Sequence, residues 1–240
     1  MYQFELHAHT RECDPTAYVL AGDLVSLYAE KGYQGLVITD HYISLFDEWF
    51  PDELVGLDHK QRIKRWLRGY ETAKKKAEEY GMTVLLGAEL RFDGYPNDYL
   101  IYGADEEFYY NAPRLNHLKD IEELMPLLPE GVCVVQAHPF RRRMVVEPPK
   151  SVWGLEVHNG GTPEFHNELA RQYALHYNKA MTSGSDTHKT AAVGKGGIQI
   201  EEPILTQQDL IRTLRSGAYT LIQNDCIKDY AHNYAKEKEQ

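Results

Sequence analysis

The segment Gly35-Leu36-Val37-Ile38-Thr39-Asp40-His41 joins a short apolar run to a histidine. A run of this length that begins at a glycine is typical of a strand buried on both faces of a parallel sheet. A histidine directly after such a strand can serve as a metal ligand or as an acid–base group. The segment therefore predicts a buried strand with a chemically active side chain at its C-terminal end.

Six other apolar runs of similar length are separated by amphipathic segments. They cover residues 4–6, 83–87, 99–102, 132–135, 152–157 and 180–183. Strands that alternate with helices indicate either a parallel βα barrel or an open, doubly wound sheet. No linker rich in glycine, serine or proline divides the chain, so we predict one domain over residues 1–228 and a charged tail over 229–240.

Four helices are predicted from the residues at their ends. We expect a helix capped by Asp23 that stops at Gly32, a long helix over 60–80, a helix capped by Thr162 with Pro163 as its first residue, and a helix with a capping box at 206–209 that ends at Gly217. Residues 194–197 are expected to form a mobile loop. Residues 42–57 form either a lid over the site or part of the barrel rim.

The composition restricts the partners and the compartment. The 240-residue chain has 42% hydrophobic residues and a formal net charge of −10, which argues against nucleic acid as a partner because binding it requires a basic surface. The chain has neither the ~18-residue apolar stretch of a membrane span nor the pattern of a signal peptide. Three cysteines at unrelated spacings suggest reduced thiols, so we expect a cytoplasmic protein that does not bind membranes.

Side chains able to bind metals follow nearly every predicted strand. They are His7, His9, Asp14, His41, Glu89, His138, His158, Asp186 and His188, with Asp105 as a weaker candidate. In a parallel barrel the C-terminal ends of the strands converge on one face, where active sites form. The pattern therefore predicts a single site. The remaining histidines lie on predicted helices or in the tail and are expected to be solvated or to pack: His59, His117, His166, His176 and His232.

The types of ligand indicate which ions could bind. Imidazoles mixed with carboxylates, without a thiolate, suit zinc, manganese or iron. If His158 is set aside as a residue that contacts substrate or supports a neighbour, five histidines and three carboxylates remain, more than one ion can use. We therefore predict two or three divalent ions, with Glu89 available as a bridging ligand.

The order of these motifs resembles the polymerase and histidinol phosphatase (PHP) superfamily. The motifs are His7-x-His9, Asp14, Thr39-Asp40-His41, Gly87-x-Glu89, Ala137-His138-Pro139 and Gly184-Ser185-Asp186-x-His188. The resemblance covers residues 4–188 and implies a distorted (β/α)7 TIM-like barrel, an α/β fold with a metal cluster in its mouth. Many members that bind three ions have a histidine at the end of the fourth strand. This chain has Asp105 there, so it differs from those members at a position that bears on the third ion.

The resemblance also implies how the ligands are shared among the ions. His7, His9, Glu89 and Asp186 would hold the first ion, Asp14, His41 and His188 the second, and Glu89 with His138 would help to hold a third.

The resemblance and the ligand set together predict a metal-dependent phosphoesterase that uses a metal-bound hydroxide. Its catalytic residues would be His7, His9, Glu89, Asp186 and His188, and its substrate-binding residues would be Arg11, Arg141, His158 and Lys189. The expected substrate is a small phosphorylated metabolite, such as histidinol phosphate, or a nucleotide. Two alternatives are a metallohydrolase that acts on an amide or ester and a non-catalytic module that binds metal.

Overall fold

The strands form one sheet in which segments far apart in the chain lie side by side. The computed structural model describes residues 1–224. Its strands are β1 (Tyr2–Ala8), β2 (Gly35–Ile38), β3 (His41–Tyr42), β4 (Thr83–Arg91), β5 (Asp98–Tyr102), β6 (Cys133–Gln136), β7 (Gly154–Asn159), β8 (Ala180–Gly184), β9 (Gly196–Ile200) and β10 (Thr220–Gln223). Their order is β10-β9-β1-β2-β4-β5-β6-β7-β8, and β3 pairs with the end of β4.

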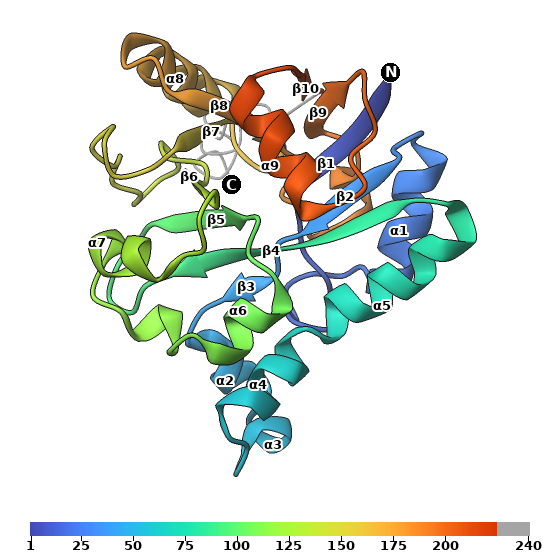
Figure 1. Cartoon of the computed structure of the whole chain (residues 1–240), viewed down its shortest axis with the longest axis vertical. Coiled ribbons are helices and arrows are strands. Elements are labelled where there is room, and N and C mark those ends of the chain that lie inside the picture. Colours follow the sequence, from blue (N-terminus) through green and yellow to red (C-terminus); the bar gives the residue numbers. More distant parts are fainter. Residues whose placement is uncertain (225–240) are drawn as a thin grey trace, which may run out of the picture.

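The sheet curls into a nearly closed barrel, as the predicted fold requires (Figure 1). At the closure the Ser183 hydroxyl of β8 accepts a hydrogen bond from the Gly197 amide of β9 at 3.2 Å and donates one to the Ile222 carbonyl of β10. Ala8, at the end of β1, forms a parallel bridge with Thr187, which follows β8. This bridge brings the His-x-His motif next to the Gly-Ser-Asp-x-His motif.

The direction of β5 differs from the prediction of an all-parallel barrel. All seven predicted strands are present, and β1–β2–β4 and β6–β7–β8 are parallel. β5, however, runs antiparallel to both β4 and β6. The cause is the short connection 92–97, because a parallel crossover needs about a dozen residues or more. The N-terminal end of β5, at Asp98, therefore lies at the end of the barrel where its neighbours have their C-terminal ends.

The strands β9 and β10 were not predicted. β9 pairs antiparallel with β1, β10 pairs antiparallel with β9, and β9 includes Gly196 and Gly197. The prediction of a mobile loop over 194–197 is therefore wrong for these two glycines. A Cβ on Gly196 would overlap the backbone of Gly184 in β8, so a glycine is needed where the two strands meet.

The helices lie outside the barrel or across one end of it. They are α1 (Ala21–Glu30), α2 (Leu45–Trp49), α3 (Pro51–Leu54), α4 (His59–Trp66), α5 (Arg68–Ala77), α6 (Glu106–Asn111), α7 (Ile121–Leu124), α8 (Glu164–His176) and α9 (Gln207–Ser216). Short 3-10 turns occur at Glu78–Tyr80, Leu115–His117, Met125–Leu127 and Thr190–Ala192. The helices α1 and α5 lie next to each other against the β2–β4 side (Figure 1).

Helix ends follow the predictions only in part. The capping box of Thr206 and Asp209 is present, and Gly217 ends α9 with a left-handed φ of 69°. Asp23 does not cap α1, which begins at Ala21, because the Glu12 carboxylate accepts the Ala21 amide hydrogen bond at 3.0 Å.

Two further helix predictions need correction. The long helix over 60–80 is divided into α4 and α5 at Leu67 and ends in a 3-10 turn. Thr162 does not cap α8, since Pro163 occupies the cap position and the Thr162 hydroxyl donates to Asn159 Oδ1 at 3.1 Å.

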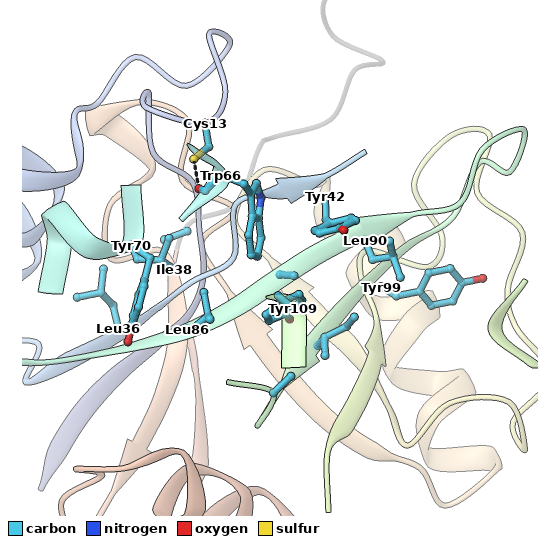
Figure 2. Packing of buried hydrophobic residues seen from close by; sticks show 14 of the residues in the cluster. Cys13, Leu36, Ile38, Tyr42, Trp66, Tyr70, Leu86, Leu90, Tyr99 and Tyr109 are labelled. Atoms are coloured by element: carbon cyan, nitrogen blue, oxygen red, sulfur yellow. Dashed lines mark hydrogen bonds between the residues drawn. The ribbon is translucent and has the colours of Figure 1, made fainter. Parts of the chain in front are cut away.

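Two hydrophobic clusters stabilise the barrel. Inside it, Leu210 and Leu214 of α9 pack with strand residues such as Phe4, so α9 covers one end of the interior. Outside it, a larger cluster joins the helices to the sheet. Figure 2 shows part of this cluster, including Cys13, whose thiol donates to the Trp66 carbonyl at 2.7 Å. With one end covered by α9, the other end is left for polar side chains.

Among residues 1–224 no helix has the length and apolar character needed to cross a membrane. Cys13 and Cys133 are buried free thiols. Cys226, His232 and the predicted tail over 229–240 lie outside the described residues.

Candidate metal centre

Four buried side chains form the middle of the site. The Nε2 atoms of His7 and His9 lie 3.1 Å apart. The Glu89 carboxylate lies 3.4 Å from the first and 3.3 Å from the second. Asp186 Oδ1 lies 3.6 Å and 3.3 Å from the same two nitrogens. The residues predicted to hold the first ion therefore converge on one point.

Asp14, His41 and His188 are assembled beside this point. Asp14 Oδ2 lies 3.3 Å from His41 Nδ1 and 3.1 Å from His188 Nε2. His41 Nε2 lies 3.2 Å from Glu89 Oε2, and the His41 ring stacks on that of His9 at 4.2 Å between centroids. Glu89 thus lies between the first and second predicted sets.

A carboxylate that the sequence analysis missed lies on the other side of Glu89. His138 Nε2 is 2.9 Å from Glu89 Oε1 and 3.8 Å from Oδ2 of Asp98. Asp105, the candidate chosen from the sequence, instead caps α6 by accepting the Phe108 amide hydrogen bond at 2.9 Å. The two aspartates lie at opposite ends of β5, and because β5 is antiparallel its first residue faces the site.

The ligand atoms fall into three overlapping groups, in each of which they lie within 4.8 Å of one another. The groups are His7, His9 and Glu89; His9, His41 and His188; and Glu89, Asp98 and His138. The first group is part of the predicted first set, and the second contains His9 in place of the predicted Asp14.

The donor chemistry of the three groups fits divalent cations. Carboxylates buried away from water are costly unless positive charge offsets them, and Glu89, Asp98 and Asp186 are all buried. The Nδ1 atoms of His9 and His138 have no hydrogen-bond partner among the described residues, whereas their Nε2 atoms point at carboxylates. Imidazole and carboxylate donors without a thiolate suit zinc, manganese or iron.

Protons on histidines balance part of the negative charge. Burial by itself would lower the pKa of His7, but the neighbouring carboxylates of Glu156 and Glu89 raise it well above its usual range. Burial also opposes the shift at His188, where hydrogen bonds to carboxylates, foremost Asp14, raise the pKa to about 10. These protons lie where cations would bind, so cations and protons compete for the site.

Glu156 supports the site and was not identified from the sequence. Its Oε1 atom lies 2.8 Å from His7 Nδ1, and its Oε2 atom accepts the His138 amide hydrogen bond at 3.0 Å. A metal-binding histidine usually donates its second ring N–H to such a carboxylate, which fixes the ring orientation. The sequence signal was a charged residue within the apolar run 152–157.

Asp40 holds the loop that carries Asp14. It accepts hydrogen bonds from the Thr10 amide at 2.6 Å and from the Thr10 hydroxyl at 2.7 Å. Burial raises the pKa of Asp40 to about 7. Through these contacts Asp40 supports the backbone and side chain of Thr10.

The backbone adopts uncommon conformations at two of the candidate ligands. His138 has φ of 31° and Asp186 has φ of 51°, both in the left-handed region that non-glycine residues rarely occupy. Such conformations persist where the surrounding structure enforces them and are concentrated at functional sites.

Arg141 is the only one of the predicted substrate residues that contacts the candidate ligands in the part of the chain described. Its Nη2 atom donates to Asp186 Oδ2, to Asn159 Oδ1 at 3.0 Å and to Thr162 Oγ1 at 3.1 Å. Arg141 and His7 hold the pKa of Asp186 well below its usual range, although burial opposes this. Arg141 therefore orients a candidate ligand, a role that the sequence did not indicate.

Among the described residues, the other predicted substrate residues make no hydrogen bond or ion pair to the candidate ligands. His158 Nε2 bonds the Lys195 carbonyl at 2.9 Å. The Lys189 side chain is exposed and lies over the Tyr18 ring at 5.4 Å, and Arg11 is exposed.

Residues 42–57 pack against the barrel rim. Phe46 of α2 is buried in the outer hydrophobic cluster, and Asp47 binds Arg62 at 2.6 Å and Arg114 at 2.5 Å. His59, which we expected to be solvated or to pack, lines a small cavity together with His41. The structure favours the rim over the lid for this segment.

The comparisons with known proteins agree with this description. Residues 164–219 match the family model described as PHP-associated. A two-domain protein from Bacteroides vulgatus, described as containing a predicted PHP-like metal-dependent phosphoesterase, aligns over 93% of this chain with a TM-score of 0.62 and 16% identity. The chain has the PHP fold. It covers 65% of the Bacteroides protein, slightly less than two thirds of its length.

Two other solved structures have a fold similar to that of this chain at 16% identity. A Bifidobacterium adolescentis protein, provisionally described as a metal-dependent phosphoesterase, has a TM-score of 0.50 over 88% of this chain and 95% of its own. An amidohydrolase from Chromobacterium violaceum, with bound sulfate and no metal, has a TM-score of 0.53 over 90% of this chain and 97% of its own. No curated protein matches the sequence. The fold and the family match together bear out the resemblance to the PHP superfamily.

Proposed function

We propose that this chain is a metal-dependent hydrolase of phosphate esters. The observation that carries the proposal is the convergence of five histidines and four carboxylates from different strands in one mostly buried cluster: His7, His9, His41, His138, His188, Asp14, Glu89, Asp98 and Asp186. A cluster of this kind reduces stability unless cations bind it, so its presence favours a function that uses cations.

The protein residues would place ions and substrate with respect to each other. Divalent zinc, manganese or iron ions would supply Lewis acidity and lower the pKa of a coordinated water. Glu89 suits a bridging position because its two oxygens face different histidines, Oε1 facing His138 and Oε2 facing His41. Glu156 directs the Nε2 atom of His7 towards the cluster by holding its Nδ1 atom.

Arg141 is the best-placed cation for a phosphate oxygen. Its guanidinium already lies beside Asp186, and further donor positions of the same planar group can bind an anion. Arg142 and Arg143 follow it directly and are exposed, which adds positive charge on the same loop. We assign a smaller role to these three residues, because Lys189 lies over the Tyr18 ring, His158 bonds the Lys195 carbonyl and Arg11 is exposed.

The proposed substrate is a small phosphorylated molecule, such as histidinol phosphate, or a nucleotide. The net charge of −10 does not favour a long nucleic acid, while a few arginines at the mouth suffice for a small phosphate ester. The Chromobacterium violaceum protein, which has a similar fold, is described with bound sulfate, an anion of the same shape as phosphate.

Amide hydrolysis is the second candidate, because that relative is described as an amidohydrolase. Ions in the same positions could polarise a carbonyl group instead of a phosphoryl group.

A substrate panel distinguishes these functions. The protein is loaded with Zn²⁺, Mn²⁺ or Fe²⁺ and assayed with p-nitrophenyl phosphate, bis(p-nitrophenyl) phosphate, nucleotides and a set of amides. We expect turnover of at least one phosphate ester. Hydrolysis of amides alone would favour the second candidate, and bound metal without any hydrolysis would favour a non-catalytic module.

A further inference from the structure

Arg91 holds both oxygens of the carboxylate that completes the third ligand group. It is the last residue of β4 and lies opposite Asp98, the first residue of β5. Arg91 Nε donates to Asp98 Oδ1 at 2.6 Å, and Nη2 donates to Oδ2 at 2.7 Å. The Asp98 side chain is 2% exposed and that of Arg91 is 36% exposed. The pair is therefore a two-point ion pair with one buried partner, the strong form of this contact.

The same Asp98 belongs to the group with Glu89 and His138. Its Oδ2 atom, which faces His138 Nε2 at 3.8 Å, is also the acceptor for Arg91 Nη2. A cation bound between these three side chains would share one carboxylate with a guanidinium. Like charges so close in a buried place repel each other strongly.

The arginine at the other end of the cluster is arranged differently. Arg141 contacts only the Oδ2 atom of Asp186 and leaves Oδ1 facing His7, His9 and His188. Asp186 can thus accept an arginine and a cation on separate oxygens. Both oxygens of Asp98 accept hydrogen bonds from Arg91. Asp186 therefore has one oxygen without an arginine partner for an ion, and Asp98 has none.

We propose that the Arg91 guanidinium takes the place of a third cation, so that this chain binds two divalent ions tightly. One ion would be held by His7, His9, Glu89 and Asp186, and the other by Asp14, His41 and His188, so that His9 serves one ion only. Arg91 supplies the positive charge that Glu89 and Asp98 require in the third group. This inference rests on the proposed function only in taking the cluster as a metal centre.

Counting bound ions tests the inference without measuring activity. The metal-free protein is titrated with Mn²⁺, and free and bound ions are measured by equilibrium dialysis. We expect two tight sites in the unaltered protein and three in Arg91→Met, whose third site should bind at least tenfold more tightly than any third site of the unaltered protein. Arg91→Met/Asp98→Asn should return to two sites. Arg212→Met, which removes an exposed arginine paired with Asp209 on α9, should behave like the unaltered protein.

Stability provides a second readout if Arg91→Met folds poorly. That variant leaves the buried Asp98 carboxylate unpaired, so its metal-free form should have a lower Tm. Mn²⁺ should raise its Tm by more than it raises that of the unaltered protein, and the excess should vanish with Asp98→Asn.

Three outcomes would overturn the inference: three tight sites in the unaltered protein with loss of one in Asp98→Asn, no gain of a site in Arg91→Met, or an equal response of Tm to Mn²⁺ in both proteins. A protein that binds no Mn²⁺, Zn²⁺ or Fe²⁺ at all would instead refute the proposed function.

Discussion

The Nδ1 atom of His7 lies 2.8 Å from the Oε1 atom of Glu156, and both side chains are buried. This contact fixes the ring so that its Nε2 atom faces His9 and Glu89. Glu156→Gln keeps the shape but weakens the acceptor, and we expect metal affinity to fall about ten- to a hundredfold. Metal titration of the purified variant measures this change. Glu107→Gln, at an exposed position on α6, is the matched control, and an equal loss of affinity in both variants would contradict the role of Glu156.

Gly184 is required by its close approach to the site. A Cβ at this position would overlap His7 Cβ and would lie 2.7 Å from Glu156 Oε1. We expect Gly184→Ala to reduce the free energy of unfolding by about 1–3 kcal/mol, the usual cost of overpacking, and to weaken metal binding. Denaturant unfolding checks this. The control is Gly22→Ala in α1, where the nearest atom is 3.8 Å away and alanine should be neutral or stabilising. Equal effects of the two substitutions would show that Gly184 is not special.

Arg141 has two possible effects that can be separated. Arg141→Ala removes a contact to Asp186 and a donor for phosphate, so both metal affinity and KM should change. Loss of a charge-assisted hydrogen bond costs about 1.5–3 kcal/mol, which corresponds to roughly a ten- to hundredfold fall in kcat/KM. Kinetics at saturating metal isolate the substrate effect, and we expect the fall to persist there. Full recovery at high metal would mean that Arg141 only orients Asp186.

The pH dependence of the metal-free protein should reveal the paired histidines. The pKa of His188 is raised to about 10 in the folded state, so its contribution to stability is complete below its ordinary pKa near 6.5 and is lost as pH rises towards 10. The Tm should therefore fall over this range, and His188→Asn should flatten the fall. The same protons must leave when cations bind, so metal affinity should increase with pH. A Tm of the metal-free protein that does not respond to His188→Asn anywhere between pH 6.5 and 10 would contradict this assignment.

The strands and the main ligands could be predicted because each is encoded locally. A short apolar run followed by a histidine or carboxylate identifies a buried strand and a polar end, as at Ile38 and His41. Parallel topology then brings those ends together without further information.

Asp98 could not be found by searching the C-terminal ends of strands, because it lies at the N-terminal end of β5. The available signal was the short connection after Arg91, which excludes a parallel crossover and reverses β5. The contact between Arg141 and Asp186 could not be predicted either. Arg141 is close to His138 in the sequence, but Asp186 lies in a distant part of the chain.

The central claim is that turnover of a phosphate ester depends on ions held by this cluster. The most direct measurement is phosphate release from the ester with the highest turnover, before and after removal of metal by a chelator, with bound metal determined in parallel. We expect activity to disappear with the metal and to return when Zn²⁺, Mn²⁺ or Fe²⁺ is restored. Asp186→Ala and Glu89→Ala should lose bound metal and several orders of magnitude in kcat, while His176→Ala, at an exposed position on α8, should retain both. Undiminished phosphate release by the metal-free protein, or by Asp186→Ala without bound metal, would contradict the account.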